Sequence, residues 1–444
     1  MAQKTIYVCG ECGTTAPKWS GKCSECESWG SLVEEAVSSQ SASSKTSSRP
    51  ANTQVLNDID TAHSGERIDT CIDEVNQVLG GGIVPGSISL VAGEPGIGKS
   101  TLLLQMAAAI ADSRSVLYVS GEESLQQVKL RAERLQLEPK QLELLSSTDA
   151  DSVAATIKDK RYDFVIVDSI QTMSTQQVGA NPGTVSQITT SSHILQEVAK
   201  TTNSAVLIVG HVTKAGNIAG PKVLEHLVDT VLHLEGERFG GFKLLRGVKN
   251  RFGSTNEVGV FEMQERGLIP VDNPSARFLQ ERQSSSGSVV FTAMEGTRAL
   301  MVEVQALVNT SPFGYPKRTS VGFDGNRLNV LIAVLSQHGG VNLADKDVYI
   351  NVVGGMKLNE PAADLAVAMA VASSAKQKPL RDKHVVFGEV GLSGEVRSIA
   401  YAEARIKEAK RMKFKAAVGP ECDNPFVQPV TNIRDAIGAG LSSK

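Results

Sequence analysis

The stretch Gly-Glu-Pro-Gly-Ile-Gly-Lys-Ser-Thr at 93–101 constrains the fold more than any other feature of this 444-residue chain. It matches the pattern G-x-x-x-x-G-K-[ST], and it lies between an apolar run at 87–92 and a helix-compatible run at 99–111. In that context a glycine-rich loop turns its backbone N–H groups toward phosphate oxygens, and the following helix points its positive N-terminal end at them. The motif therefore predicts an α/β domain that binds a nucleotide.

The same pattern assigns roles within the loop. Lys99 is expected to reach the β- and γ-phosphates of ATP, and the Ser100 hydroxyl is expected to ligate Mg²⁺. The other residues of the expected ATP site are Gly93, Glu94, Pro95, Gly96, Ile97, Gly98 and Thr101.

Further apolar runs, rich in Val, Ile and Leu, alternate with helix-compatible stretches in the central part of the chain. Near-continuous apolar strands separated by helices indicate a parallel sheet that is buried on both faces. The strands are expected at 87–92, 116–120, 163–168 and 205–210, and the helices at 99–111, 125–135 and 186–201.

Carboxylates follow two of these strands. Asp168 ends one of them, where it would hold Mg²⁺ or its water shell. Glu122 and Glu123 come just after the strand at 116–120, at the sheet edge where catalytic groups of open α/β sheets collect. Hydrolysis needs a base that orients the attacking water, and Glu122 is favoured over Glu123 for this role. The alternative is that both carboxylates only add charge at a helix N-terminus.

Two cations stand close together in Gly-Val-Lys-Asn-Arg-Phe-Gly at 247–253. Lys249 and Arg251 lie on what reads as the end of a strand. In a ring of subunits, such a pair can reach the γ-phosphate of the neighbour and stabilise the transition state. The alternative is a basic turn on the surface.

Four cysteines fall near the start of the chain, in the pattern C-x2-C-x10-C-x2-C. Tetrahedral zinc takes four thiolates, and each C-x2-C turn directs two of them at one centre. A segment this short cannot bury a sufficient core without a metal, so a zinc ribbon is predicted. Its ligands are Cys9, Cys12, Cys23 and Cys26. Trp19 and Trp29, the two tryptophans of the chain, are expected to cover its small core rather than to face a partner.

Two stretches without apolar periodicity divide the remainder of the chain. One is serine-rich and flexible, and the other is a second linker. The expected organisation is a zinc ribbon at 1–32, a flexible linker at 33–56, an ATPase domain at 57–272, a linker at 273–287 and a C-terminal domain at 288–444.

Composition excludes several classes of protein. Hydrophobic residues make up 41% and charged residues 21% of the chain, which is the balance of a folded protein. The longest nearly apolar run, 102–111, is shorter than the about 18 residues that a membrane span needs, and no signal peptide is evident. The chain is therefore expected in the cytoplasm, without a membrane partner. Because the net charge is −3, any contact with nucleic acid requires a local basic stripe or a pore.

Taken together, the motifs resemble the RadA (Sms) family of bacterial DNA-repair proteins over essentially the whole chain. The resemblance is carried by the four cysteines, by Gly-Gly-Gly at 80–82 ahead of the phosphate loop, by Lys-Asn-Arg-Phe-Gly at 249–253 and by the C-terminal domain. It implies a RecA-like ATPase that forms a homohexameric ring on single-stranded DNA and branched intermediates, acts beside the RecA recombinase, and promotes branch migration in recombination and repair. It also implies Glu122 as the hydrolytic glutamate, and Lys249 and Arg251 as cations that act in trans.

The C-terminal domain resembles the proteolytic domain of Lon, through Gly-Glu-Val-Gly-Leu-Ser-Gly-Glu-Val at 388–396 and Glu-Pro-Ala-Ala-Asp at 360–364. Lon uses a serine whose proton is taken by a lysine. The position of that serine holds Ala362 here, and the expected lysine falls near Glu403. The resemblance therefore implies an α+β scaffold without proteolytic activity.

Loops that line the channel of such a ring would bind DNA. Two segments lie where these loops belong: 173–187, which contains glycines and a proline, and 211–225, which carries Lys214 and Lys222. Basic, mobile loops suit a sequence-independent grip on the backbone. A cationic stretch at 405–415 is expected to be a solvated helix face, with a basic groove as the alternative.

Two other functions compete with a DNA motor. A RecA-like ATPase in signalling would have duplicated ATPase halves, whereas this chain has one phosphate-loop motif. An ATP-dependent protease would need the nucleophile that Ala362 does not supply.

Overall fold

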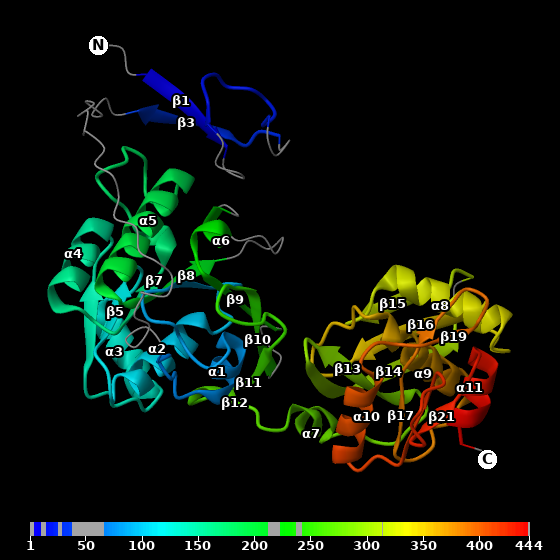
Figure 1. Cartoon of the computed structure of the whole chain (residues 1–444). Helices are drawn as coiled ribbons and strands as arrows, with labels where there is room; N and C mark the ends of the chain where they lie inside the picture. The colour runs from blue at the N-terminus through cyan, green and yellow to red at the C-terminus, as the bar shows by residue number, and fades with distance from the viewer. Residues whose placement is uncertain are drawn as a thin grey trace, which may run out of the picture. The chain divides into compact units, whose positions relative to one another are not determined.

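The structure is a computed structural model, and it describes residues 4–9, 15–24, 29–37, 66–211, 223–236, 242–312 and 314–442. The chain forms two compact units (Figure 1). The first contains Met1–Arg238 and Lys243–Pro270, and the second contains Phe239–Phe242 and Val271–Lys444.

The ribbon is a small antiparallel sheet in the order β2-β1-β3, with β1 at Lys4–Cys9, β2 at Thr15–Ala16 and β3 at Leu32–Val37. Cys9, Cys23 and Leu32 are buried together in its core. Because β3 continues to Val37, the ribbon extends beyond residue 32, where the sequence placed its end. The expectation for the tryptophans is wrong: Trp19 is 60% and Trp29 is 79% exposed.

The ATPase domain contains a nine-stranded sheet in the order β12-β11-β10-β9-β4-β8-β7-β5-β6. Strands β9, β4, β8, β7, β5 and β6 pair in parallel. Strands β10 to β12 extend the β9 side of the sheet, where β10 pairs antiparallel with β9 and β12 pairs antiparallel with β11. The strand bounds are Ile88–Gly93 (β4), Val116–Ser120 (β5), Leu142–Ser146 (β6), Phe164–Asp168 (β7), Ala205–His211 (β8), Thr230–Glu235 (β9), Phe242–Asn250 (β10), Val258–Gln264 (β11) and Gly267–Pro270 (β12).

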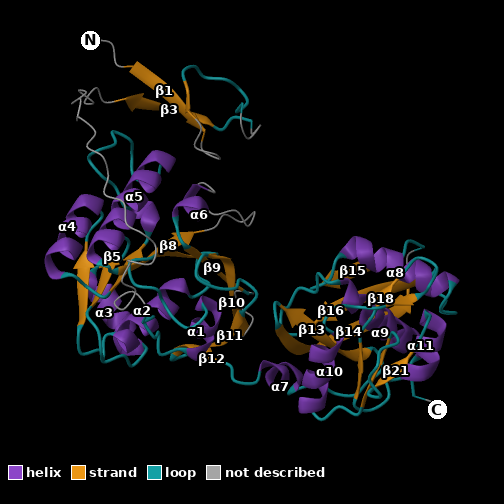
Figure 2. Cartoon of the chain, viewed as in Figure 1, coloured by secondary structure: helices purple, strands orange, loops and turns teal. Residues whose placement is uncertain are grey.

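Helices cover both faces of this sheet (Figure 2). Side chains of α1, α2 and α3 form one apolar cluster with the sheet, and those of α4, α5 and α6 form a second. The helix bounds are Asp73–Leu79 (α1), Lys99–Ile110 (α2), Leu125–Arg134 (α3), Ala150–Lys160 (α4), Val185–Thr202 (α5) and Val223–Leu227 (α6). The alternation of apolar strands and helices thus confirms the predicted RecA-like α/β class, and each predicted strand and helix is present.

The C-terminal domain has a seven-stranded mixed sheet in the order β15-β16-β14-β13-β17-β20-β21 and a separate pair, β18-β19. The strand bounds are Ser288–Glu295 (β13), Arg298–Thr310 (β14), Arg318–Val321 (β15), Lys346–Val352 (β16), His384–Val386 (β17), Glu389–Val390 (β18), Val396–Arg397 (β19), Ala416–Gly419 (β20) and Val427–Pro429 (β21). The helices are Pro274–Leu279 (α7), Gly325–Gln337 (α8), Asp364–Lys376 (α9), Ala402–Arg411 (α10) and Ile433–Gly440 (α11).

Helix α7 lies inside the segment 273–287, which the sequence placed as a linker. The side chain of Asn273 accepts a hydrogen bond from the backbone of Ala276, and Pro274 occupies the first turn, where its missing N–H costs nothing. These capping residues explain a helix that apolar periodicity did not reveal.

Lys407, Arg411 and Lys415 are exposed, as expected for a solvated helix face, whereas Arg405 on α10 is buried. Its side chain is 1% exposed, and it donates to both carboxylate oxygens of Glu360 and to the carbonyl oxygen of Thr292. Its guanidinium carbon lies 5.6 Å from the centre of the Phe291 ring. Arg405 therefore ties α10 to β13 and to the turn that precedes α9.

We expect Arg405→Ala to lower the opening free energy of β13 by about 3–5 kcal/mol, because it leaves a carboxylate and a carbonyl without their buried partner. Hydrogen exchange of the β13 amides in the full chain measures this. Arg397→Ala is the matched control, since its ion pair with Glu395 is exposed and should contribute little. Equal protection in the two variants would contradict the structural role of Arg405.

Candidate functional site

The phosphate loop connects β4 to α2, as the motif predicted. Gly96 and Gly98 have φ values of 78° and 115°, in the left-handed region that favours glycine. Gly93 is required for a different reason, since a Cβ atom there would lie 2.6 Å from the carbonyl oxygen of Leu234 on β9. Ser100 and Thr101 follow in the first turn of α2, and a hollow of about 600 Å³ opens beside Thr101, bounded by the turn between β11 and β12.

Lys99 lies inside this loop and is buried. Its ammonium donates to the carbonyl oxygens of Gly93 and Glu94, at 2.9 and 3.0 Å. Burial lowers the pKa of Lys99, and the charges of Asp168 and Glu122 partly offset that effect. The loop thus surrounds a cation whose charged form is favoured by two nearby carboxylates and disfavoured by burial.

Asp168 reaches the same edge of the sheet through the strand register. Val167 pairs with Ile208 on β8, and Gly93 pairs with His211 on the same strand, so β7 and β4 end side by side with β8. The carboxylate of Asp168 accepts a hydrogen bond of 2.7 Å from the Tyr118 hydroxyl. Burial, reinforced by the charge of Asp168, holds the pKa of Tyr118 well above its ordinary value, so the phenol keeps its proton and donates.

Glu122 and Glu123 differ sharply in their surroundings. Ser169, which follows Asp168, donates a short hydrogen bond to the Glu122 carboxylate. The Glu123 carboxylate instead forms a close ion pair with Arg131 on α3. Glu122 therefore lies toward the phosphate loop and Asp168, whereas the Glu123 carboxylate is paired with a side chain of the adjacent helix.

The turn that carries Glu122 is held directly against the segment after β7. The Gly121 N–H donates to the carbonyl oxygen of Asp168 at 2.8 Å. A Cβ atom on Gly121 would lie 2.1 Å from the Thr172 hydroxyl, so only glycine allows this approach. Helix α3 then starts with a capping box between Ser124 and Gln127, which fixes where the turn ends.

Lys249 and Arg251 do not join the phosphate loop of their own chain. Lys249 pairs with Val231, and the Arg251 N–H donates to the carbonyl oxygen of Asp229, which itself bonds to Ile88 at the opposite end of β4. The distance from Ile88 to Gly93 along β4 is about 16 Å at about 3.3 Å per residue. The two cations thus lie at the far edge of the sheet from the phosphate site.

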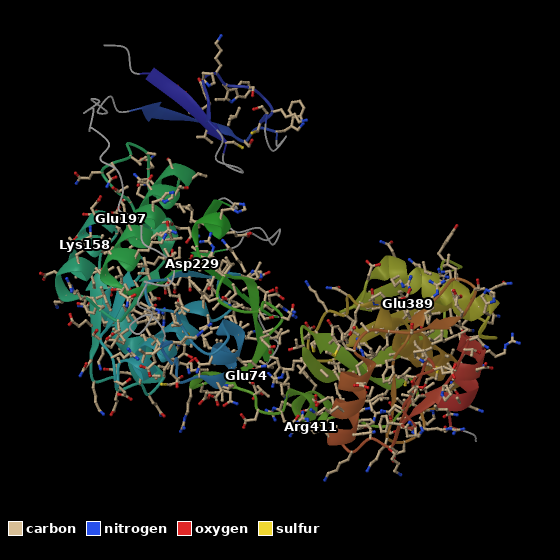
Figure 3. The ribbon with its side chains drawn as sticks, viewed as in Figure 1. Glu74, Lys158, Glu197, Asp229, Glu389 and Arg411 are labelled. Carbon is tan, nitrogen blue, oxygen red and sulfur yellow. The ribbon has the colours of Figure 1, made fainter. Side chains whose placement is uncertain are left out.

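Both cations have partners at that edge. The Lys249 ammonium donates to the carbonyl oxygens of Glu225 and Val228, at 2.6 and 2.7 Å. Burial and the nearby Arg251 lower the pKa of Lys249. Arg251 pairs with Asp229, which is labelled in Figure 3, at 3.1 Å, and its side chain is 54% exposed. Arg251 is therefore the more accessible of the two.

The candidate DNA loops have different outcomes. Lys214 and Lys222 lie outside the described residues, so their contacts remain a prediction. In the segment at 173–187, whose contact with DNA also remains a prediction, the buried Gln187 amide donates to the carbonyl oxygens of Thr175, Val178 and Ala180 at 2.8–3.1 Å. Its oxygen also accepts from the Thr175 N–H. Hydrogen bonds of a single glutamine thus connect this loop to the start of α5.

The described part of the zinc ribbon fits a thiolate site. Cys9 and Cys23 are both buried against Leu32, whereas Cys12 and Cys26 lie outside the described residues. Their pattern of two C-x2-C turns suits tetrahedral zinc. Within the described residues, the ribbon therefore brings one cysteine of each pair into its core.

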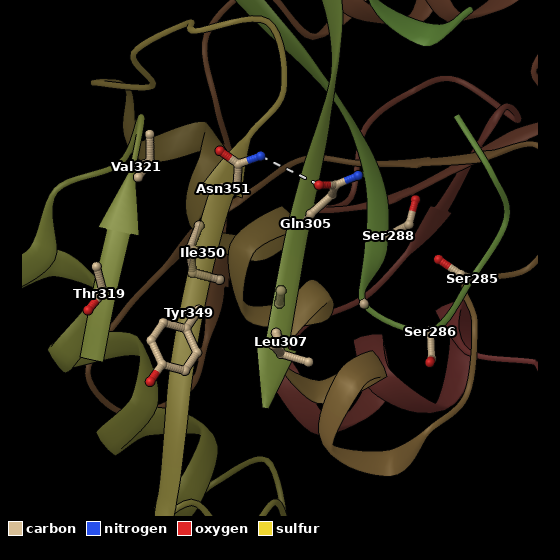
Figure 4. A pocket seen from close by; sticks show the side chains of 12 residues that line it. Ser285, Ser286, Ser288, Gln305, Leu307, Thr319, Val321, Tyr349, Ile350 and Asn351 are labelled. Atoms are coloured by element: carbon tan, nitrogen blue, oxygen red, sulfur yellow. Dashed lines mark hydrogen bonds between the residues drawn. The ribbon is translucent and has the colours of Figure 1, made fainter. Parts of the chain in front are cut away.

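Neither of the two Lon-like catalytic positions in the C-terminal domain has the side chain that a Lon-type protease needs. Ala362 is buried in the turn before α9, and Glu403 is exposed on α10. Glu360 and Arg405, each two residues from one of those positions, form an ion pair. A hollow of about 540 Å³ elsewhere in the domain includes neither position (Figure 4). It is lined by residues of β14, β15 and β16 and by residues 285–288, of which all but Gly287 are serines.

Three residues of the site could not be predicted from the sequence. Tyr118 reads as an ordinary apolar strand residue, Ser169 as a residue after a strand, and Arg131 as a surface cation of an amphipathic helix. Only the pairing of β5 with β7 and the path of α3 bring them to Asp168, Glu122 and Glu123, so no local sequence signal marks them.

None of the helices in the described residues combines the length and the hydropathy that crossing a membrane requires.

Family models match the N-terminal ribbon, the central domain and the C-terminal domain separately. Residues 7–34 match the model described as a rubredoxin metal binding domain, which identifies the ribbon as a zinc-binding module. Residues 55–217 match an AAA domain, so the central part is an ATPase domain. Residues 313–423 match a model described as subunit ChlI of Mg-chelatase, in the Lon-like C-terminal domain.

Relatives match the chain over nearly its whole length. The chain is 47% identical to the DNA repair protein RadA of Bacillus subtilis over 99% of both chains, and 46% identical to that of Rickettsia bellii over 98% of both. Among solved structures, the crystal structure of the RadB recombinase covers 46% of this chain and 100% of its own, at 23% identity and a TM-score of 0.38. With this identity over nearly its whole length, the chain belongs to the RadA family of DNA repair proteins.

Proposed function

We propose that this protein is a DNA-dependent ATPase that works as a ring-shaped motor and promotes branch migration of intermediates in homologous recombination. The observation that carries the proposal is the meeting of Lys99, Asp168 and Glu122 at one edge of the sheet, with Lys249 and Arg251 at the other. One edge has the groups that bind and hydrolyse a nucleotide. The opposite edge has cations that this site does not use.

In this proposal the phosphate loop binds ATP. The N–H groups of 93–101 and the Lys99 ammonium take the phosphates, and the nucleoside extends toward the hollow beside Thr101. Ser100 and Asp168 would hold Mg²⁺, whose charge offsets the negative charge that develops on the phosphates. Lys99 exchanges the carbonyl oxygens of Gly93 and Glu94 for phosphate oxygens when the nucleotide binds.

Glu122 is the group that orients the attacking water. Ser169 holds its carboxylate by a hydrogen bond, and Gly121 fixes its turn against the carbonyl oxygen of Asp168. A general base must be held within hydrogen-bond reach of the water that it activates. Glu123 cannot take this role without breaking its ion pair with Arg131.

The cations at the opposite edge support a ring. Arg251 is more than half exposed and too far from its own phosphate loop, so it would serve the site of a neighbouring subunit. A homohexamer closes such head-to-tail contacts without free ends. Lys249 binds the carbonyl oxygens at the end of α6, which directly follows the loop that carries Lys214 and Lys222, so it links that loop to the subunit interface.

Single-stranded DNA and branched intermediates are the proposed substrates, and the RecA recombinase is the proposed partner. Lys214 and Lys222 would track the phosphate backbone from the channel of the ring. The net charge of −3 agrees with a grip confined to such a channel rather than spread over the surface.

Substitutions separate binding from hydrolysis. We expect Lys99→Ala to abolish binding of a fluorescent ATP analogue, since it removes the ammonium that the phosphate loop directs at the β- and γ-phosphates. We expect Glu122→Gln to keep binding but to lower ATP turnover by about 10²-fold or more, as for the loss of a general base. Glu123→Gln is the matched control and should retain most of the turnover. The reverse order of the two glutamine variants would show that the assignment within this pair is wrong.

The choice of stimulant tests the function itself. We expect ATP turnover of the full chain to rise with single-stranded DNA and not with an unfolded protein, which an ATP-dependent protease would favour. The ratio of turnover with and without DNA should fall in Lys214→Ala/Lys222→Ala, and the salt dependence of DNA binding should weaken because two phosphate contacts are lost. Lys129→Ala, on an exposed face of α3, is the control. Turnover that is indifferent to DNA would exclude the motor and favour a signalling ATPase.

A further inference from the structure

Tyr118 is a buried tyrosine that the hydrolytic mechanism does not use directly. It lies on β5 among apolar side chains of α2 and α3, including Leu102 and Val128, and 1% of it is exposed. Phenylalanine would fill this position equally well, and a buried hydroxyl is unfavourable unless it is hydrogen-bonded. The hydroxyl group is therefore the feature that needs an explanation.

The register between β5 and β7 directs the Tyr118 hydroxyl at Asp168. Ser120 on β5 pairs with Asp168 on β7, and Tyr118 precedes Ser120 by two residues. Side chains two residues apart on a strand share one face of the sheet, so Tyr118 and Asp168 project to the same side. The Tyr118 Oη atom lies 2.7 Å from Oδ2 of Asp168.

We propose that Tyr118 is a positioning residue for the magnesium ion: its phenol fixes the orientation of the Asp168 carboxylate that receives the ion or its water shell. The inference rests on the magnesium role proposed above for Asp168. Among the described residues, the Asp168 side chain is hydrogen-bonded through Oδ2 alone. Its Oδ1 atom is thus left to accept a hydrogen bond from magnesium-bound water.

The physical advantage is a carboxylate that is oriented before the ion arrives. Rotation of an aspartate carboxylate about χ2 is broadly permitted, so packing alone does not select one orientation. A hydrogen bond from a neutral phenol to a charged carboxylate is charge-assisted and stronger than a bond between neutral groups. Partners of this kind behind a metal-binding side chain typically change metal affinity by about 10–100-fold when they are removed.

The measurement is the binding of a fluorescent ADP analogue to the full-length protein, titrated with Mg²⁺ and repeated in EDTA. We expect Tyr118→Phe to leave binding in EDTA unchanged and to raise the Mg²⁺ concentration for half-maximal effect by about tenfold. Tyr162→Phe is the matched control, because the buried Tyr162 also donates to a carboxylate, that of Glu143, at 2.9 Å and away from the site. This control should leave the Mg²⁺ titration unchanged.

The Asp168→Asn variant tests whether the effect of Tyr118 on Mg²⁺ binding passes through the Asp168 carboxylate. If Tyr118 acts through Asp168, Tyr118→Phe should cause no further shift in the Asp168→Asn background. A normal Mg²⁺ titration in Tyr118→Phe, when Asp168→Asn alone shifts it, would overturn the role of Tyr118 and leave that of Asp168 standing. Weaker binding of Tyr118→Phe in EDTA, or an equal shift in Tyr162→Phe, would also overturn it, because either result indicates a general structural effect. No shift in Asp168→Asn would remove the magnesium role itself.

Discussion

The parallel pairing of β4, β8, β7 and β5 determines where each functional group of the ATPase domain lies. Parallel strands end at the same edge, so the phosphate loop after β4, Asp168 at the end of β7 and Glu122 after β5 come together. Antiparallel pairing of β10 with β9 has the opposite result for Arg251, which is returned to the starting end of β4. One sheet thus separates the groups proposed to act within a subunit from those proposed to act on another.

Much of this arrangement could be predicted from the sequence, because it depends on local patterns. The glycines of the phosphate loop indicate the backbone conformations that the loop requires. The uninterrupted apolar strands indicate that both faces of the sheet are buried. The choice of Glu122 over Glu123 had a weaker basis. It depends on Ser169 and Arg131, which approach from other elements, and no spacing in the sequence reveals that approach.

Expectation and structure differ where the composition of a segment does not reveal its tertiary partners. Two tryptophans suggested a covered ribbon core, yet both are exposed. The amide of Gln187 satisfies several backbone groups at 173–187, which the glycines and the proline of that segment do not indicate. In the cationic stretch at 405–415, Lys407, Arg411 and Lys415 are exposed as expected for a solvated face, whereas Arg405 is buried and paired with Glu360.

The central claim is that Arg251 completes the nucleotide site of a neighbouring subunit. The most direct test mixes Arg251→Ala protein with Glu122→Gln protein, each nearly inactive alone, and measures ATP turnover against the mixing ratio. The account predicts that mixtures regain turnover, because an Arg251→Ala subunit keeps its own Glu122 and receives Arg251 from its neighbour. A cation of this kind contributes about 10³–10⁵ in rate, so partial recovery is measurable. No recovery at any ratio, in oligomers that native mass spectrometry shows to contain both subunits, would contradict it.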